Sequence, residues 1–248
     1  MSARGLAREV AGAYGVTFHD PVADLTELMQ PELGAQPVAA TVTTAGCGLF
    51  VLRTIAGIDP RATTPGWMRN RLVASGIRPV SLVVDVTNYV MIELGQPLHA
   101  FDAERISGDI VVRHADAGEV LELIDHSTRD LDPSDIVIAD GNGVLSLAGI
   151  MGGAGSEIAS DTATVVIEAA HFDADAIAQS CRRHRLSTDA SRRFERGVDT
   201  QLAPFAAHRA AQLLADLAGG RNCGLSAVET AQPQARIAVT ADYIASRI

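Results

Sequence analysis

The sequence predicts a mixed α/β fold of the α+β type, in which a mostly antiparallel sheet packs against helices. Short runs rich in valine, isoleucine and leucine follow one another between residues 110 and 148. The sequence Asp-Gly-Asn-Gly at 140–143 is a strong hairpin turn signal, which favours antiparallel pairing of the runs beside it. Helical periodicity occurs in separate stretches, at 67–75, 173–184 and 202–218.

The elements follow from local signals along the chain. Gly5–Tyr14 is an amphipathic stretch, whereas residues 20–37 contain the proline, glycine and acidic residues of a linker. Pro65 starts one helix, Asp173 caps another, and the glycine pair after residue 218 ends a third. The expected strands lie at 39–42, 50–58, 110–113, 120–124, 136–139, 144–148 and 164–170.

Composition indicates an ordinary globular protein. The 248 residues are 47% hydrophobic, and the formal net charge is −10. This charge disfavours indiscriminate binding to nucleic acid, although a local basic patch can still engage one specific RNA. No apolar run reaches the roughly 18 to 20 residues of a membrane helix, and no signal-peptide pattern opens the chain, so we expect a cytoplasmic protein without membrane contact.

The cysteines indicate neither a disulfide framework nor a metal site. They are odd in number, at positions 47, 181 and 223, and none forms a C-x-x-C pair. We therefore expect no metal site.

The stretch from Val83 to Asp102 places polar groups inside an apolar run. Asp85 is a plausible N-cap of a helix that Gly95 and Pro97 end. Thr87 and Asn88 then lie in the first turn, and His99 on the following extended segment can fold back towards them. A hydroxyl, an amide and an imidazole would converge on one small site. The alternative is structural, because threonine and asparagine are frequent near helix starts and a lone histidine is usually a hydrogen-bonded core residue.

Further candidates have equally ordinary explanations. Arg78, in a turn before this stretch, can bond a phosphate or form a surface salt bridge. The glycines of AGIMGGAG at 148–155 can bring backbone close to a ligand or simply bend a sheet. Glu168 lies in the apolar run TVVIEAA, where a carboxylate needs donors, so it either belongs to a framework ion pair or binds a ligand. The six arginines between 182 and 196 can meet RNA phosphates or neutralise nearby acids.

Five segments together resemble one family. They are RPVSLVVDVTNYV, GQPLHAFD, AGIMGG, VVIEAAHF and TDASRRFERGVD, in this order from about Leu49 to Gly220. They are similar to the editing domain of the bacterial phenylalanyl-tRNA synthetase beta chain. The resemblance implies that family's editing-domain fold at 39–225. Residues 1–38 would then be a joining helix and linker from a preceding domain, and 226–248 the truncated start of the next.

The resemblance also implies roles for particular residues. His99, Thr87, Asn88 and Arg78 match the positions that handle the ester and water. Glu168 and Gly152 match the positions that read the tyrosine para-hydroxyl. Thr188 and Ala190 match the other positions that bind the amino acid. An ionised Glu168 would accept the phenol proton while the Gly152 N–H donates to the phenol oxygen.

The implied activity is post-transfer editing, the hydrolysis of mischarged Tyr-tRNA(Phe). Such a site is needed because an apolar synthetic pocket rejects an added hydroxyl by only about a hundredfold. The alternatives are a non-hydrolytic RNA-binding or structural module of the synthetase and, more remotely, an unrelated small-molecule hydrolase, which lacks support from any nucleophile-elbow motif. The resemblance implies the tRNA(Phe) acceptor end and the alpha chain of an α2β2 enzyme as partners. It places ATP and Mg²⁺ on the alpha chain and implies no cofactor for this fragment.

Overall fold

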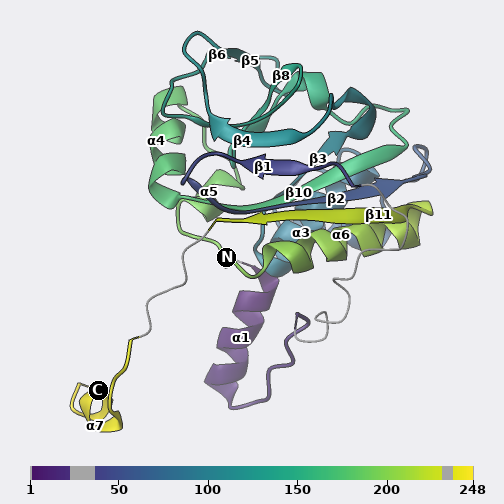
Figure 1. Ribbon diagram of the computed structural model, residues 1–248. Coiled ribbons are helices and arrows are strands. Elements are labelled where there is room, and N and C mark those ends of the chain that lie inside the picture. The colour runs from purple at the N-terminus through teal and green to yellow at the C-terminus, as the bar shows by residue number, and fades with distance from the viewer. Residues whose placement is uncertain (1, 23–36, 231–236, 248) are drawn as a thin grey trace.

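The computed structural model describes residues 2–22, 37–230 and 237–247 (Figure 1). The helices are α1 Ala3–Tyr14, α2 Gly66–Ala74, α3 Leu82–Leu94, α4 Ala174–His184, α5 Ser191–Phe194, α6 Ala203–Ala218 and α7 Ala241–Ala245, with short 3₁₀ turns at Ala103–Arg105 and Ala154–Ser156. The strands are β1 Ala40–Val42, β2 Cys47–Ala56, β3 Leu98–Asp102, β4 Ile110–His114, β5 Val120–Glu122, β6 Thr128–Asp130, β7 Ile136–Asp140, β8 Gly143–Leu147, β9 Met151–Gly152, β10 Thr164–Phe172 and β11 Arg221–Glu229. Most of the predicted linker lies outside the described residues.

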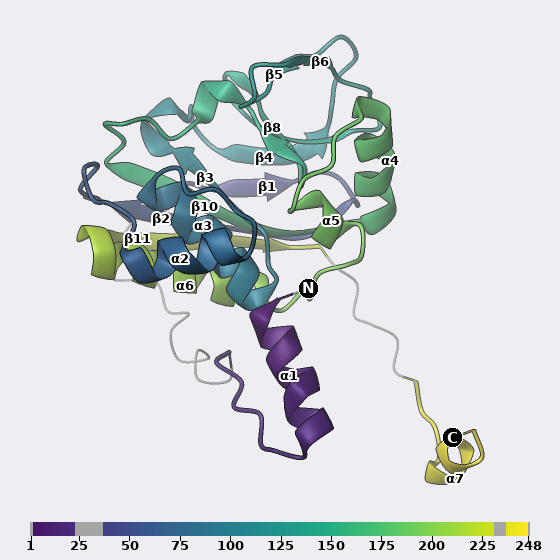
Figure 2. The same ribbon diagram turned by 180° about the vertical axis from the view of Figure 1, so that it is seen from behind.

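The predicted mixed, mostly antiparallel architecture is confirmed. A four-stranded antiparallel sheet has the order β11-β2-β10-β3, and a five-stranded sheet has the order β1-β4-β7-β8-β9. In the second sheet only the β1–β4 pair is parallel, and β5 and β6 form a separate ribbon. Helices α3 and α6 cover one face of the four-stranded sheet, and the five-stranded sheet faces the other (Figures 1 and 2).

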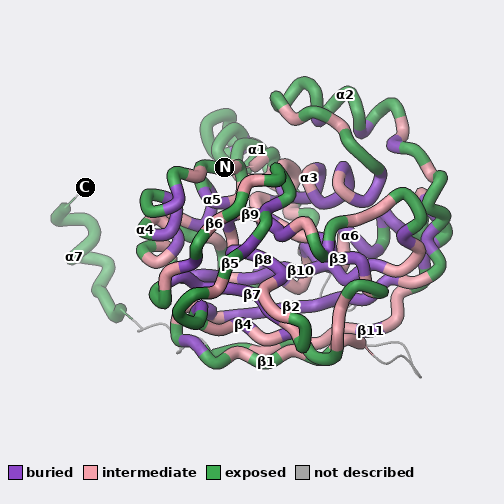
Figure 3. The backbone as a smooth tube through the Cα atoms, turned by 90° about the horizontal axis from the view of Figure 1, so that it is seen from above, coloured by how far each residue is buried: buried purple, intermediate pink, exposed green. Residues whose placement is uncertain are grey.

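Strand β10 divides the core into two parts, because successive side chains of a strand point to opposite faces. Val165, Ile167 and Ala169 join the cluster beneath α3 and α6. Val166 and Ala170 join the cluster between the two sheets. The strand is buried along nearly its whole length, as is its neighbour β2 (Figure 3). Residue 168 therefore falls between the sheets.

Helix α3 begins one turn earlier than the sequence predicts. Its N-cap is Ser81, whose side chain makes no capping bond, so the prediction that Asp85 is the N-cap was wrong. Asp85 is buried inside the helix, and its carboxylate accepts hydrogen bonds from the N–H of Val80, at 2.8 Å, and from the hydroxyl of Thr64. The carboxylate thus reaches back to hold the turn before the helix. At the other end, Gly95 adopts the expected left-handed conformation.

Strand β11 is missing from the sequence-based prediction, for a physical reason. It lies at an edge of its sheet, its burial is irregular, and its register against β2 shifts between Asn222 and Gly224. A bulge and an interior glycine remove the two-residue alternation that identifies a strand. The pairing with β2 extends to Glu229, beyond the domain boundary expected at residue 225.

A buried carboxylate fixes helix α4 to the five-stranded sheet. Asp135, just before β7, is fully buried and accepts hydrogen bonds from the Ser180 hydroxyl at 2.6 Å, from His184 Nε2 at 2.7 Å and from Arg183. Burial acts to raise the pKa of Asp135, but these hydrogen bonds outweigh it and hold the pKa below its ordinary value. The network sets the position of α4 and of the segment that follows it.

We expect Asp135→Ala to lower the free energy of unfolding by roughly 3–5 kcal/mol, because it leaves Ser180 and His184 buried without their acceptor. Urea unfolding followed by circular dichroism measures this loss. The exposed Asp161 serves as the control, and Asp161→Ala should stay within about 0.5 kcal/mol of the wild type. Equal effects of the two substitutions would contradict the role of the network.

Candidate functional site

A small cavity of about 60 Å³ lies between the two sheets, and elements far apart in sequence line it. Strand β3 contributes His99, β10 contributes Glu168, and the glycine-rich segment around β9 contributes Gly152. Helix α5 closes the cavity with Phe194, and Ala190 directly precedes that helix. The volume is below the roughly 300 Å³ of typical ligand pockets, so binding a tyrosyl group requires side chains to move. The unbranched Met151 in the lining is suited to such movement.

His99 and Glu168 are direct partners in the β3–β10 ladder. Directly opposed residues carry their side chains on the same face of a sheet, with Cβ atoms about 4.5–5.5 Å apart. Here that face is the interior between the sheets, where the His99 ring packs edge-on against Phe101 with ring centroids 4.6 Å apart. The imidazole and the carboxyl group therefore share one apolar compartment.

Gly152 brings backbone against the imidazole. A Cβ atom at this position would overlap His99 Cε1 and lie 2.7 Å from its Nε2, closer than side chains tolerate. The N–H of Gly153 donates to the Leu145 carbonyl, which makes that pair a hydrogen-bonded one. Gly152 and Ser146, the neighbouring pair, therefore form a non-hydrogen-bonded pair, in which the two N–H groups do not bond across the ladder. The Gly152 N–H thus points away from β8, to the side where Leu123 bridges Gly153 and the Ile124 N–H donates to the Gly152 carbonyl at 3.0 Å.

Burial governs the charges of both titratable groups. It raises the pKa of Glu168 to about 8 and lowers the pKa of His99 to about 4. His99 Nε2 is shielded from solvent and has no hydrogen-bond partner among the described residues. At pH 7 the carboxyl group is therefore mostly protonated and the imidazole is neutral. Burial therefore opposes the ionised form expected of Glu168, and no cation in the described structure compensates the desolvation.

Thr188 does not line the cavity but holds a residue that does. Its hydroxyl donates to the carbonyl of Ile150 at 3.0 Å, and Ile150 lines the cavity. Thr188 and Ser191 also exchange side-chain and backbone hydrogen bonds, each hydroxyl accepting the other residue's N–H at 2.9–3.0 Å. This reciprocal pair fixes the start of α5 and thereby the position of Ala190.

The other three predicted site residues do not line the cavity. The hydroxyl of Thr87 donates to the carbonyl of Val84 within α3 at 2.8 Å. Asn88 is half-buried on the same helix, and Arg78 is exposed in the turn before it. The cavity is instead completed by residues that sequence reasoning did not select, among them Ser146 and Phe194. Ser146 carried a signal, since it is a polar residue in an apolar strand, whereas Phe194 carried none.

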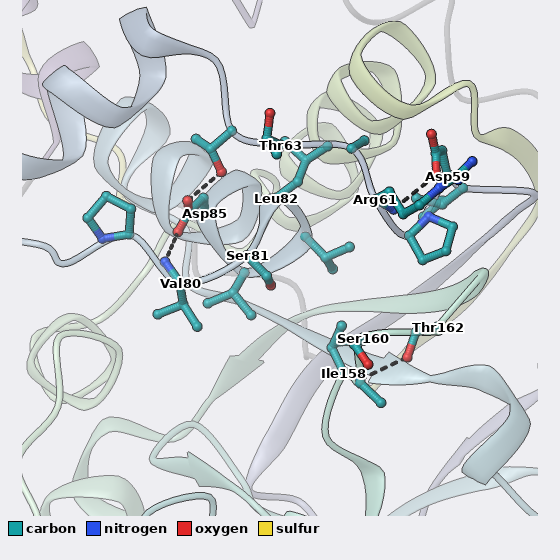
Figure 4. A pocket seen from close by; sticks show the side chains of 18 of the residues that line it. Asp59, Arg61, Thr63, Val80, Ser81, Leu82, Asp85, Ile158, Ser160 and Thr162 are labelled. Carbon is teal, nitrogen blue, oxygen red and sulfur yellow. Dashed lines mark hydrogen bonds and ion pairs between the residues drawn. The ribbon is translucent and has the colours of Figure 1, made fainter.

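A larger cavity of about 430 Å³ lies at the N-terminal end of α3 (Figure 4). It contains no predicted site residue. Its buried carboxylate, Asp85, has its hydrogen-bond partners within the protein, and Arg61 is exposed and turns towards Asp59. The smaller cavity contains His99 Nε2, a buried atom without a hydrogen-bond partner among the described residues, and the buried Glu168, so we take the smaller one as the candidate site.

The structure gives no sign of a metal or membrane site in the parts that it describes. Residues 2–22, 37–230 and 237–247 contain no group of three or more potential ligands from histidine, cysteine, aspartate and glutamate. Over the same ranges no helix is long and apolar enough to cross a bilayer.

We expect Gly152→Ala to lower the free energy of unfolding by about 1–3 kcal/mol, because the new methyl group must displace the His99 ring. Chemical denaturation measures the change. Gly155→Ala is the matched control: no atom lies within 4 Å of its added Cβ, so its stability should equal that of the wild type. If both variants were as stable as the wild type, the close approach of Gly152 to His99 would be disproved.

The pKa of Glu168 predicts a pH dependence of stability. The unfolded chain loses this proton near pH 4.5, whereas the folded protein retains it up to about pH 8. The contribution of Glu168 to stability should therefore fall as pH rises between these values, with a slope of at most about 1.4 kcal/mol per unit. The lowered pKa of His99 has the opposite effect up to its ordinary value of 6.5, so a net fall is expected between pH 6.5 and pH 8. Glu168→Gln removes the titrating group and should flatten the curve measured by urea unfolding over this upper range. Glu157→Gln, at an exposed glutamate, is the control. Parallel curves of stability against pH for the wild type and Glu168→Gln would refute the raised pKa of Glu168.

Comparison with known proteins gives consistent matches. A model of the B3/4 domain matches residues 46–219. The phenylalanine–tRNA ligase beta subunit of Thermobifida fusca is 50% identical over 244 residues, which are 98% of this chain and 29% of that protein. The same subunit of Cutibacterium acnes is 51% identical over 219 residues, covering 88% of this chain and 26% of that protein. A crystal structure of an N-terminal fragment of the phenylalanyl-tRNA synthetase beta-subunit from Pyrococcus horikoshii has a TM-score of 0.46 at 15% identity, covering 99% of this chain and 67% of that one.

The chain spans less than a third of the length of these curated relatives. Within that span, the family model matches more than half of the residues. The chain therefore belongs to the B3/4 domain family, and its sequence resembles the segment of phenylalanine–tRNA ligase beta subunits that it matches.

Proposed function

We propose that this chain is the editing region of a phenylalanine–tRNA ligase beta subunit and that it hydrolyses Tyr-tRNA(Phe). The observation that carries the proposal is the burial of Glu168 in the cavity, where its carboxyl group has no hydrogen-bond or ion-pair partner among the described residues. A buried polar group of this kind costs folding free energy unless a ligand satisfies it. The para-hydroxyl of tyrosine can do so, and the ring of phenylalanine cannot.

The protonation states define how the hydroxyl would be held. A protonated Glu168 has a carbonyl oxygen that can accept the phenol proton and an O–H that can donate. The Gly152 N–H does not bond to β8 and would donate to the phenol oxygen. Phenylalanine would leave these groups desolvated and unpaired, which can supply discrimination on the order of 10⁴.

The reaction is the attack of water on the carbonyl carbon of the tyrosyl ester. The bond between that carbon and the ribose oxygen breaks, tyrosine leaves as the free acid, and the ribose oxygen takes up a proton. His99 offers Nε2, which has no hydrogen-bond partner in the described parts of the chain, as an acceptor for the water. Since its pKa is about 4, the imidazole is a weak base, and we assign it the positioning of water rather than full proton abstraction.

Three residues with implied catalytic roles act, in this proposal, from outside the observed cavity. Thr87, Asn88 and Arg78 would contact the RNA end of the ester only after the cavity opens to admit the amino acid. Thr188 and Ala190 shape the wall opposite Glu168.

The rest of the proposal concerns the whole enzyme. We propose that the editing unit ends with β11, since this strand belongs to the four-stranded sheet. The complete protein would work in the cytoplasm with an alpha chain as an α2β2 enzyme, and ATP and Mg²⁺ would act on that alpha chain. An RNA-binding module without hydrolytic activity is the alternative, and it is favoured by the arginine-rich segment 182–196.

The test is deacylation of Tyr-tRNA(Phe) and Phe-tRNA(Phe) by the full alpha–beta enzyme carrying this region. His99→Ala should lower the rate with the tyrosyl ester by roughly a hundredfold through loss of positioning. Glu168→Ala should lower the ratio of tyrosyl to phenylalanyl hydrolysis by about ten- to a hundredfold, which corresponds to one lost buried hydrogen bond.

Glu168→Gln is the matched variant, because glutamine retains a carbonyl acceptor and an N–H donor without charge. It should keep more of the preference for tyrosine than Glu168→Ala does. Equal loss with both esters in Glu168→Ala would remove the assigned role of Glu168. A wild-type enzyme that leaves the tyrosyl ester intact would favour the RNA-binding module instead.

A further inference from the structure

A third pocket, of about 210 Å³, lies on the other side of the segment that closes the candidate site. Arg182 and Arg185 line it from the end of α4, and Ser187 and Ser191 line it from the following segment. Both arginines and Ser187 are exposed. The pocket therefore presents guanidinium and hydroxyl groups to solvent.

The structure separates the arginines of this region into two groups. Arg183 bonds to Asp135, Arg193 donates to the carbonyl of Asp189 at 2.7 Å, and Arg196 pairs with Glu195 at 2.9 Å. These three are engaged within the fold. Glu195 also lines the pocket, but its carboxylate is the one paired with Arg196.

The other three arginines face solvent. In the described parts of the chain, no carboxylate lies within ion-pair distance of Arg182, Arg185 or Arg192. Arg192 instead donates to the hydroxyl of Ser187 at 3.2 Å, at the edge of the pocket. All 20 basic residues of the chain are arginines, in a protein of net charge −10. Neutralisation of nearby acids, one of the two explanations that the sequence left open, thus accounts for only part of this cluster.

The pocket and the candidate site lie on opposite sides of one short segment of the chain. Ser187, Ser191 and Glu195 recur every four residues and face the basic pocket. Ala190 and Phe194 are likewise four residues apart and face the cavity that contains Glu168. The Thr188–Ser191 pair and the bond from Thr188 to Ile150 hold this segment in place. The two sites are thus fixed relative to each other across this one short segment.

We propose that Arg182 and Arg185, with the hydroxyl of Ser187, bind a backbone phosphate of the RNA 3′ end whose terminal ribose carries the ester into the cavity. This inference rests on the proposed function and assigns the RNA contact of the same site. Guanidinium groups bind phosphate oxygens through paired hydrogen bonds, and a hydroxyl supplies a further donor. The single helical segment between the two sites would then hold the phosphate and the amino acid at a set separation.

The experiment measures binding separately from hydrolysis. The probe is an uncharged RNA hairpin with the acceptor stem and single-stranded 3′ end of tRNA(Phe), titrated with the full chain by fluorescence anisotropy between 50 and 200 mM salt. The double variant R182Q/R185Q should bind at least tenfold more weakly. The slope of log affinity against log salt should fall in magnitude by about 1 to 2.

The double variant R61Q/R69Q is the matched control. It removes the same charge from exposed arginines at the larger cavity near α3 and should bind the hairpin like the wild type. Equal weakening by both double variants would show a diffuse electrostatic effect and overturn the proposal. R182K/R185K retains the charge at the C-terminal end of α4, where cations stabilise a helix. It should keep the salt slope but bind more weakly than the wild type, because lysine lacks the planar fork.

The two hypotheses can fail independently. In deacylation assays with the full enzyme, R182Q/R185Q should raise KM for Tyr-tRNA(Phe) and leave kcat unchanged. If the wild type hydrolyses the ester while R182Q/R185Q binds RNA normally, editing stands and the phosphate pocket is refuted. If hydrolysis is absent but binding requires the two arginines, the phosphate pocket stands and editing is refuted. A loss of thermal stability in R182Q/R185Q with unchanged RNA affinity would assign these arginines to the end of the helix alone.

Discussion

The pairing of β10 with β2 and β3 is the constraint on which the rest of the structure depends. This strand is covered on both faces, by helices on one side and by the five-stranded sheet on the other. Its alternating side chains therefore belong to two separate cores. Glu168 lies on the face between the sheets, and the antiparallel register places His99 directly beside it. A shift of β10 by one residue would turn Glu168 to the other face and away from His99, so core packing and site geometry depend on the same ladder.

The site combines two groups whose charged forms are both disfavoured. Burial keeps the carboxyl group of Glu168 protonated and the imidazole of His99 neutral, although they lie side by side and could otherwise form an ion pair. Desolvation is the cause of both pKa shifts, and it commonly disfavours the charged forms of buried groups. The result is a compartment without net charge that can donate and accept hydrogen bonds. These properties suit a ligand that is apolar except for one hydroxyl.

The arginines illustrate how one segment carries structural and exposed cations together. Arg183 completes the network around Asp135 that holds α4 to the sheet, while the adjacent Arg182 points to solvent. Arg185 adopts a left-handed conformation at the C-terminal end of α4, a position that more often contains glycine. After Arg185 the chain changes direction and leads to the Thr188–Ser191 pair and then to α5. One continuous stretch of the chain therefore determines the position of α4, a wall of the cavity and the basic pocket.

The sequence by itself determined which segments form helices, strands and turns, because local signals identify these elements. The hairpin turn at 140–143, the Asp173 cap, the left-handed Gly95 and the periodicity of α6 all depend on neighbours within a few residues. It also identified Glu168 and Gly152 as unusual, the first by a charge in an apolar run and the second by its place in a glycine-rich loop. Local signals failed for Asp85, whose partners Val80 and Thr64 depend on how the preceding loop folds back, and for β11, where a bulge removes the alternation.

Only the tertiary structure decided which candidates share a cavity. It brought His99, Gly152, Glu168 and Ala190 together from three strands and the start of a helix, and it left Thr87, Asn88 and Arg78 outside the lining. It also decided that Glu168 is protonated and that three of the six clustered arginines lack carboxylate partners within the described residues. Desolvation and ion pairing depend on the atoms that surround a group in three dimensions, and these come from segments up to about a hundred residues apart. A linear sequence contains the groups but not their surroundings, because burial is a property of the packed chain.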